Sequence, residues 1–344
     1  DPAEGRERVR RNLAHYGLWD DTFDARVSAV CGDLERDGLG LDAAGRAALA
    51  DVDAIYHCAA RISWLMPYRL LRASNVLGMK RVVELAIALG GPTLNVVSSA
   101  GATFVRPFED EAMVQWTLQQ TGLGTESIFE LPLGYMETKW VVDRLAERAR
   151  ARGLVVNRYS PGLICGHSET GVDSLSDSQF VYALIKGSAQ LGIVPDGRGW
   201  RFCPVDVVAR DIVRTSLLPG TRNADLCIDS STVMDPADLV DVLRARDIDV
   251  ELAPYAAWRQ RVLDLADRDD KGNALYAFTD TIFALTPLRF QGQRLQLEWR
   301  LQNRGASEEA RAALEPRRHL HRTLLERMVD YYLQLGEMPV RPPG

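Results

Sequence analysis

The feature that most constrains the fold is an alternation of strand-sized apolar runs with helix-length amphipathic stretches. The runs are ARVSAVCGDL, DVDAIYHCAA, TLNVVSSAG and GLVVNRYSPGLICG, and the helical stretch SNVLGMKRVVELAIALG separates the second run from the third. Short runs rich in Val and Ile, each followed by a helix, are typical of parallel strands joined by helical crossovers. The sequence therefore predicts an α/β fold, with a Rossmann-like, doubly wound parallel sheet that is covered by helices on both faces.

The helical stretch also indicates which of its faces packs on the sheet. Its apolar residues recur at intervals of three and four, which is the spacing of one helix face. The residues on this face are Val76, Met79, Val82, Val83, Ala86 and Ile87. We expect them to form one buried stripe.

The chain is longer than a single compact unit usually is. Its 344 residues give room for one large α/β domain and a smaller one. The strand and helix pattern weakens after about Gly166, returns in CPVDVVARDIVRTSLL and then becomes mainly helical. We predict a Rossmann-like domain over residues 1–165, to which 200–230 return, and a mainly helical C-terminal subdomain over 166–199 and 231–344.

One expected element is missing. A dinucleotide-binding fold usually begins with a strand, a glycine-rich turn and a helix whose N-terminal amides bind the pyrophosphate. No GxxGxxG element precedes Asp33, and the chain opens with the charged helical segment DPAEGRERVRRNL. We therefore expect a sheet whose N-terminal βαβ unit is absent from this chain or supplied elsewhere.

Composition excludes several classes of protein. A net charge of -6 disfavours nucleic acid as a partner, and no apolar run approaches the roughly 18 residues of a spanning helix. The charged N-terminus does not resemble a signal peptide, so we expect a cytoplasmic protein without a membrane partner. The cysteines show no paired spacing and are expected to be buried free thiols rather than metal ligands: Cys31, Cys58, Cys165, Cys203 and Cys227.

The strongest chemical signal is the segment YMETK, in which Tyr135 and Lys139 are four residues apart. Residues at this spacing share a helix face, so the ammonium would lie close to the phenol. A tyrosine titrates near pKa ~10, and a fixed cation lowers that pKa, which would let Tyr135 donate a proton near neutral pH. The same spacing also occurs by chance in many helices, where it is a packed Tyr beside a solvated Lys.

Ligands of parallel sheets bind beyond the carboxyl ends of the strands, and small or polar residues gather at those ends here. Ser98 and Ser99 end one strand, where a hydroxyl could hydrogen-bond the same substrate oxygen as Tyr135. Other strand ends carry Asp33 and Leu34, then His57, Cys58, Ala59 and Ala60, then Pro161 and Gly162. Each of these could equally be an ordinary turn or cap, and His57 has no neighbouring second ligand, so no metal site is predicted.

With these segments in order, the chain resembles the extended short-chain dehydrogenase superfamily. More narrowly, it is similar to the thioester reductase domains that end nonribosomal peptide and polyketide synthases and carboxylic acid reductases. The similarity covers nearly the whole chain and includes GDL, HCAA, the phrase LLRASNVLG, VSSA, GYMETKWVVDRL, YSPGLICG and the closing YYLQLGEMPVRPP.

The resemblance implies NADPH-dependent release of an acyl or peptidyl chain from the phosphopantetheine arm of a carrier protein. The product would be an aldehyde and, after a second hydride, an alcohol. Ser99, Tyr135 and Lys139 would form the catalytic triad, with Ser99 rather than Ser98 at the position of the family pattern. The chain would be a monomeric domain of a larger synthase.

The resemblance also places the cofactor residues. Asp33 and Leu34 would lie near the adenine, His57 to Ala60 along the cofactor, Asn75 beneath the active site, and Pro161 and Gly162 beside the nicotinamide, whose ribose Lys139 would hold. Many relatives have Thr in place of Ser99. The glycine-rich turn and the Arg that would hold the extra phosphate of NADPH are missing.

Two other functions stay open at this point. One is a freestanding extended dehydrogenase that acts on a small carbonyl, a sugar nucleotide or an acyl-CoA. The other is a nucleotide-sensing or scaffold protein of the same fold without turnover. The mainly helical C-terminal part favours the thioester reductase, and the intact set of Ser99, Tyr135 and Lys139 disfavours the sensor.

Overall fold

The computed structural model describes most of the chain with its side chains. The described residues are 1–64, 66–102, 134–176, 179–197, 200, 202–228, 234–279, 303, 305–314 and 321–339.

Four parallel strands form the main sheet, in the order β1-β2-β3-β7. They are β1 (Ala54–His57), β2 (Thr93–Val97), β3 (Val156–Pro161) and β7 (Asp225–Ile228). All four point the same way, so their carboxyl ends meet at one edge of the sheet. The predicted parallel sheet is confirmed, and β2 and β3 fall in the runs TLNVVSSAG and GLVVNRYSPGLICG.

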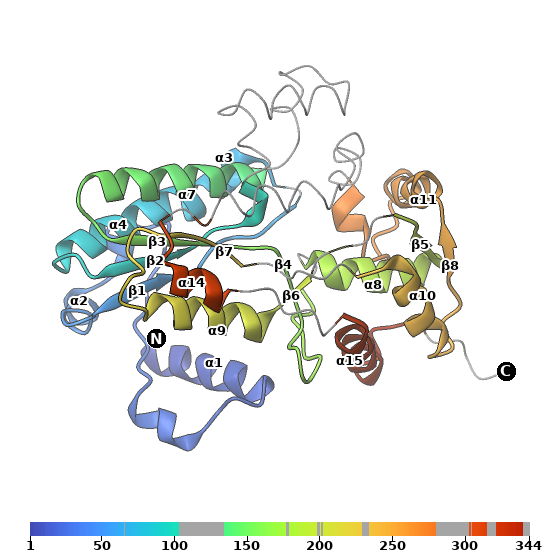
Figure 1. The fold of residues 1–344 in the computed structure, drawn as a ribbon, viewed down its shortest axis with the longest axis horizontal. Helices are drawn as coiled ribbons and strands as arrows, with labels where there is room; N and C mark the ends of the chain where they lie inside the picture. Colours follow the sequence, from blue (N-terminus) through green and yellow to red (C-terminus); the bar gives the residue numbers. More distant parts are fainter. Residues whose placement is uncertain are drawn as a thin grey trace, which may run out of the picture.

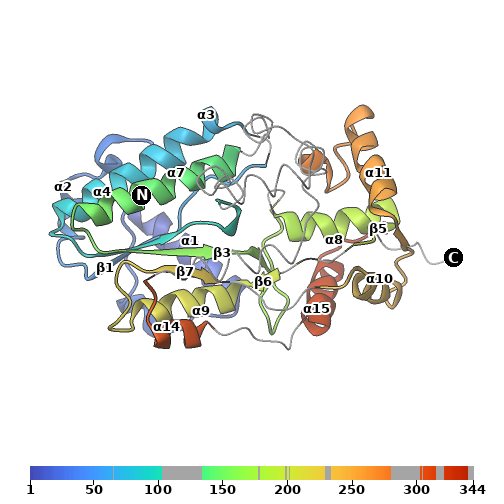
Figure 2. The same ribbon diagram turned by 45° about the horizontal axis from the view of Figure 1, so that its top comes forward.

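Helices lie on both faces of this sheet (Figures 1 and 2). One face carries α3 (Tyr68–Leu71), the π-helix η3 (Arg72–Leu77), α4 (Gly78–Ala88) and α7 (Gly134–Ala151). The other carries α9 (Val205–Ser216) and α14 (Glu308–Ala313). The N-terminal part adds α1 (Pro2–His15), η1 (Asp21–Ala25), η2 (Asp37–Gly40) and α2 (Ala43–Ala47).

The remaining helices gather beyond the carboxyl ends of the strands, at the right of Figure 1. They are α8 (Phe180–Leu191), α10 (Pro236–Arg244), α11 (Tyr255–Asp267), η5 (Tyr276–Phe278) and α15 (His321–Gln334). Two short parallel pairs accompany them: β4 (Leu163–Cys165) with β6 (Phe202–Pro204), and β5 (Ile193–Pro195) with β8 (Glu251–Ala253).

The buried apolar residues form separate cores for these two parts. One cluster joins α8, α10, α11 and α15, whereas two others pack α4 with α7 and α9 with α14 against the sheet. This supports a Rossmann-like domain and a mainly helical subdomain, whose boundaries we keep as a proposal. The helix α14 is an exception to the proposed division, since Ala306 and Ala310 pack in the α9 cluster.

Two local expectations are wrong. The run ARVSAVCGDL forms no strand, because residues 26–33 have no strand partner among the described residues. In α4 the buried stripe holds Met79, Val82 and Ala86, but Ile87 is 62% exposed. The π-helix before Gly78 holds more residues per turn, so the predicted period does not carry through from Val76 to Ile87.

The cysteine expectation is correct only in part. All five thiols are free, and Cys165, Cys203 and Cys227 are buried. Cys31 and Cys58 are exposed, because both follow the positions where the chain leaves the sheet region for a turn.

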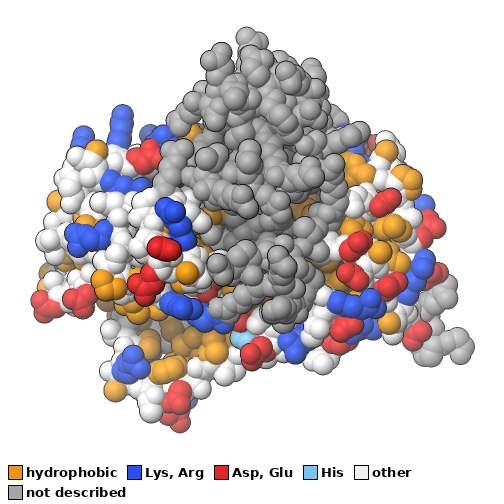
Figure 3. All heavy atoms as spheres, in the orientation of Figure 1, with side chains coloured by type: hydrophobic (Ala, Val, Ile, Leu, Met, Phe, Trp, Pro, Cys, Tyr) orange, Lys and Arg blue, Asp and Glu red, His pale blue; other side chains and the backbone are white. Residues whose placement is uncertain are grey.

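The surface gives no single-sign field. Basic and acidic side chains alternate over the described atoms on the face shown in Figure 3. Within the described ranges, no helix is both long and apolar enough to cross a membrane.

Candidate active site

Helix α7 carries the pair that the sequence singled out. Tyr135 lies in its first turn, and the Nζ atom of Lys139 lies 5.7 Å from the centre of the Tyr135 ring. The helix begins in close contact with α3: a Cβ atom at Gly134 would lie 2.4 Å from the backbone nitrogen of Tyr68. Only glycine fits there, and this contact fixes where Tyr135 enters the site.

Lys139 is anchored to the neighbouring strand. Its side chain is 5% exposed, and its ammonium donates a hydrogen bond of 2.8 Å to the carbonyl oxygen of Val97 at the end of β2. Burial lowers the pKa of Lys139 to about 8, and the charge of Asp143 opposes this shift. The ammonium is thus held against the strand end next to Ser98 and Ser99.

The pKa of Tyr135 moves against the expectation from the sequence. Burial raises it well above the ordinary value, rather than the cation lowering it. The reason is geometric, because the ammonium of Lys139 is directed at the carbonyl of Val97. In this state Tyr135 keeps its proton at neutral pH, as a proton donor must.

The two serines at the end of β2 have different environments. Ser98 is 3% exposed, and its hydroxyl donates a hydrogen bond of 2.6 Å to Asp143 on α7. Ser99 is half-buried, and its Oγ accepts a bond of 3.0 Å from the backbone nitrogen of Gly101. The Ser99 hydroxyl keeps its own proton for donation, whereas that of Ser98 is already used. This supports the choice of Ser99.

Asn75 connects three parts of the site from within the π-helix. Its side chain is 2% exposed and exchanges hydrogen bonds of 2.8 and 3.0 Å with the backbone of Arg61, in the segment after β1. Its Nδ2 atom also donates to Thr138 on α7 at 3.1 Å. Asn75 therefore lies underneath the junction of these elements, as expected.

The end of β1 lies next to the end of β2. His57 is buried, and burial together with Lys139 lowers its pKa to about 4, so its imidazole is neutral at neutral pH. Cys58 and Ala59 are exposed, and Ala60 is half-buried. Burial of the Cys58 thiol raises its pKa, although Lys139 acts in the opposite direction.

The remaining predicted residues lie at two other places. Pro161 ends β3, and the backbone nitrogen of the following Gly162 donates to Ile228 at 3.1 Å. Asp33 is exposed and accepts a bond of 2.8 Å from Glu35, whereas Leu34 packs against Gly78 at the start of α4. Asp33 and Leu34 are thus part of the α4 side of the fold.

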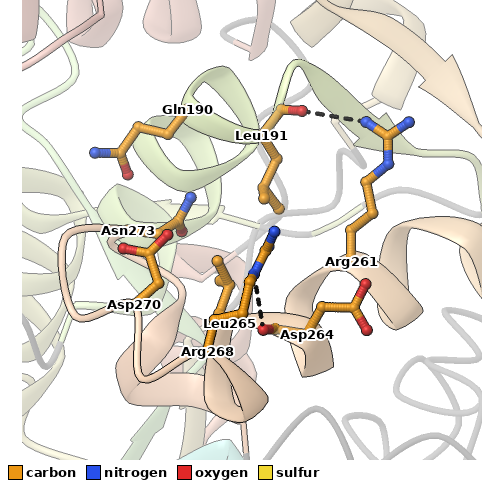
Figure 4. Close-up of a pocket in the computed structure, with 8 residues that line it drawn as sticks. All are labelled: Gln190, Leu191, Arg261, Asp264, Leu265, Arg268, Asp270 and Asn273. Carbon is orange, nitrogen blue, oxygen red and sulfur yellow. Dashed lines mark hydrogen bonds between the residues drawn. The ribbon is translucent and has the colours of Figure 1, made fainter.

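A pocket of about 430 Å³ lies away from these residues, between α8 and α11 (Figure 4). Its lining residues are Gln190, Leu191, Arg261, Asp264, Leu265, Arg268, Asp270 and Asn273. Several of its polar groups bond within the pocket wall, since Gln190 bonds Gly272 and Ala274 and Arg268 bonds the backbone of Asp264. We assign it no chemistry. No group of three or more His, Cys, Asp or Glu side chains in the described part could hold a metal ion.

Sequence reasoning missed the polar residues behind the site. These are Thr138, which bonds Asn75, and the buried pair of Asp143 and Arg158, whose charged groups are 3.2 Å apart. Asp143 follows Lys139 by four residues, which was the one available signal. The partners on β2 and β3 depend on tertiary packing, and no local pattern shows them.

Comparison with solved structures shows the same fold in the terminal R domain from the myxalamid PKS-NRPS biosynthetic pathway. The TM-score is 0.76 at 23% sequence identity, over 99% of this chain and 84% of that one.

Curated proteins show similarity in sequence. A linear gramicidin synthase protein of Brevibacillus parabrevis is 31% identical over 271 residues, which are 78% of this chain and 5% of that protein. The L-2-aminoadipate reductase of Saccharomyces cerevisiae is 32% identical over 285 residues, which are 78% of this chain and 20% of that protein. The chain therefore spans a small part of the length of these relatives.

A family profile described as "Male sterility protein", of the NAD-binding type, matches residues 1–212. The match covers the sheet from β1 to β3, the helix that carries Tyr135 and Lys139, and most of α9. The predicted resemblance to reductases of the extended short-chain dehydrogenase type is confirmed by this family and by the fold. The chain belongs to the NAD-binding male sterility protein family.

Proposed function

We propose that this chain is a reductase domain that releases an acyl or peptidyl chain from the phosphopantetheine arm of a carrier protein as an aldehyde. A second reduction would give the alcohol. The observation that carries the proposal is the bond between Lys139 and the carbonyl of Val97, which holds the α7 pair beside the strand end with Ser99. The similarity to a gramicidin synthase and to aminoadipate reductases supports the same chemistry.

The described residues fit the nicotinamide half of a dinucleotide. The exposed Cys58 and Ala59 after β1 and the small Gly162 after β3 leave backbone accessible at the carboxyl edge of the sheet. Lys139 supplies a cation there. A glycine-rich turn for the pyrophosphate is not among the described residues. We propose NADPH rather than NADH from the resemblance to thioester reductases.

The bound cofactor would supply a hydride to the thioester carbonyl carbon. Ser99 donates a hydrogen bond to the carbonyl oxygen and holds it toward Tyr135. As negative charge develops on that oxygen, Tyr135 donates its proton, giving a hemithioacetal of the substrate. This hemithioacetal then collapses to the aldehyde, and the thiol of the phosphopantetheine arm leaves with a proton. Lys139 stabilises the phenolate that Tyr135 becomes.

The carrier protein as donor distinguishes this function from that of a freestanding dehydrogenase. A phosphopantetheine thioester on a carrier brings its acyl group at high effective concentration, whereas an acyl-CoA must bind by itself. The mainly helical subdomain of α8, α10, α11 and α15 lies beyond the strand ends, where the acyl chain would approach (Figure 1). We therefore propose that the acyl or peptidyl chain lies between the strand ends and this subdomain.

The test is NADPH oxidation with an acyl thioester on a carrier protein, using protein that includes the residues encoded ahead of Asp1. Tyr135→Phe removes the proton donor and should lower the rate by about 10²–10⁴-fold. The chain offers a matched control in Tyr182, which precedes Lys186 by four residues on α8, with its ring centre 5.2 Å from that ammonium. Tyr182→Phe should keep most of the activity.

The outcomes separate the candidate functions. A carrier-bound thioester that reacts faster than the matching acyl-CoA supports the proposal, and the reverse order favours a freestanding dehydrogenase. Tight nucleotide binding without turnover of either substrate would instead favour a sensor. Equal activity of the wild type and Tyr135→Phe would contradict the role given to Tyr135.

A further inference from the structure

A buried ion-pair network lies directly behind the candidate active site. Asp143 on α7 is 2% exposed, and its two carboxylate oxygens have different partners. One oxygen accepts the hydroxyl of Ser98 at 2.6 Å, and the other lies 3.2 Å from Arg158 on β3. Burial of a carboxylate is costly unless it is paired and hydrogen-bonded, and Asp143 is both.

The network holds the strand end at two successive residues. Lys139 binds the carbonyl of Val97, and Asp143, one helical turn later, binds the side chain of Ser98. The next residue of the chain is Ser99. The distance of Ser99 from the face of α7 that carries Tyr135 is therefore set by these two contacts.

The charges around Asp143 divide into a structural side and a site side. On the structural side Arg158 also pairs with Asp225 at 2.7 Å and with Glu147 at 3.4 Å, so it would keep two carboxylates without Asp143. On the site side Asp143 acts on the charge of Lys139. Any special role of Asp143 must therefore appear at Lys139 and Ser98.

We propose that Asp143 is a positioning residue for the reaction, which fixes Ser99 through Ser98 and provides the counter-charge of Lys139. The inference rests on the proposed function, because that function makes Ser99, Tyr135 and Lys139 the reacting set. It extends the set by a residue that touches neither substrate nor cofactor.

Several groups face Lys139 from different elements. Burial lowers the pKa of Lys139, whereas Asp143 on the same helix and Cys58 after β1 raise it. His57, at the end of β1, is itself affected by the charge of Lys139, and Tyr135 lies one turn away on α7. Removal of the Asp143 charge should therefore let Lys139 lose its proton at a lower pH than in the wild type.

The first experiment needs no turnover. Protein labelled with ¹³C at lysine Cε is titrated by NMR, and Lys139→Arg assigns its signal among those of the other lysines, Lys80, Lys186 and Lys271. In Asp143→Asn the Lys139 signal should titrate at lower pH than in the wild type. Glu147→Gln is the matched control, because it removes a carboxylate that also faces Arg158, one turn further along α7. It should leave the Lys139 titration unchanged.

The second experiment separates the positioning role from simple stabilisation. Ser98→Ala keeps the charge of Asp143 and removes the contact with the strand end. With carrier-bound thioester, its kcat should fall about tenfold, with KM nearly unchanged, since misplacement of a reacting group affects the chemical step. Ser98→Thr, which restores a hydroxyl, should recover most of this loss.

The results decide the proposal in each case. An Asp143→Asn variant with an unchanged Lys139 titration would overturn the counter-charge, whether or not the protein turns over. If Asp143→Asn does not fold, Ser98→Ala decides, and an unchanged kcat would overturn the positioning role. A wild type without thioester reduction but with the predicted shift in the Lys139 titration would contradict the proposed function alone.

Discussion

At the scale of single residues, the site is defined by two opposite effects of burial. Burial raises the pKa of Tyr135 and lowers that of Lys139, so each side chain is pushed toward its neutral form. Tyr135 thus stays protonated as a donor, whereas Lys139 stays charged only because its pKa remains at about 8. Of the two, Lys139 is the residue closer to a change of state at physiological pH.

The first prediction concerns the pH dependence of the reaction. Lys139 is protonated below its pKa of about 8 and loses its charge as the pH rises through that value. The profile of kcat/KM, which reports groups of the free enzyme, should therefore fall on its alkaline side near this pH. In Lys139→Arg the residual activity should lack this limb, because arginine keeps its charge. A limb at the same position in both proteins would assign it to another group.

Ser99 allows a second prediction with a conservative control. Ser99→Ala removes a hydrogen-bond donor to the substrate oxygen and should lower kcat by about 10²-fold. Ser99→Thr keeps the hydroxyl, and many similar reductases have Thr at this place, so it should retain most of the activity. Steady-state kinetics with one thioester compare the three proteins. If the alanine and threonine variants lose equal activity, the loss comes from packing and not from the hydroxyl.

At the scale of elements, the site depends on how α7 meets α3 and the strand ends. The sequence predicted the central strands and α7 correctly, because Val-rich runs and a helical period are local patterns. It could not predict the π-helix, whose extra residue leaves Ile87 exposed, or the absence of a strand at residues 26–33, which depends on a partner strand. The contacts of Asn75 and Asp143 join elements far apart in the chain, so no spacing reveals them.

The contact between α7 and α3 gives the prediction at this scale. Gly134→Ala would place a Cβ atom 2.4 Å from the Tyr68 nitrogen and 2.5 Å from the Met66 oxygen, both of which are backbone atoms that cannot simply rotate away. The start of α7 must shift, and we expect a loss of about 1–3 kcal/mol in unfolding free energy together with reduced turnover. Denaturant unfolding and kinetics measure both effects.

Gly272→Ala is the control for this substitution. A Cβ atom there would meet only the side-chain oxygen of Asp270, at 3.4 Å, which is an ordinary contact. It should change neither the unfolding free energy nor the turnover by a significant amount. Wild-type stability in Gly134→Ala would show that α3 and α7 are less tightly packed than the structure has them.

At the scale of the whole molecule, two cores meet near the carboxyl edge of the sheet. The segment after β4 is tied to α15 by Tyr332, whose hydroxyl donates to Asp173 at 2.6 Å, and by Arg327, which bonds the carbonyl of Ser168 at 2.6 Å. Asp173 is 4% exposed, and burial raises its pKa to about 6. The attachment of α15 therefore includes an acid that titrates in the range of ordinary buffers.

This attachment predicts a pH dependence of stability. The folded state keeps the Asp173 proton up to about pH 6, whereas an unfolded chain loses it near its ordinary pKa of 3.8, so stability falls as the pH rises through this window. From pH ~4 to ~7 the wild type should lose about 2 kcal/mol relative to Asp173→Asn, which carries no titrating group. Unfolding curves at several pH values measure the difference, and Asp267→Asn, at an exposed site, should follow the wild type. Parallel curves for the wild type and Asp173→Asn would contradict the buried acid.

The central claim is that Tyr135 protonates an acyl thioester while a hydride reaches its carbonyl carbon. The most direct measurement uses NADPH deuterated at the transferred position, a carrier-bound acyl thioester, and mass analysis of the released product. The account predicts an aldehyde with one deuterium at its carbonyl carbon, formed by the wild type and by Tyr182→Phe and reduced by about 10²-fold or more in Tyr135→Phe. Free acid without deuterium, or deuterated aldehyde formed equally well by Tyr135→Phe, would contradict it.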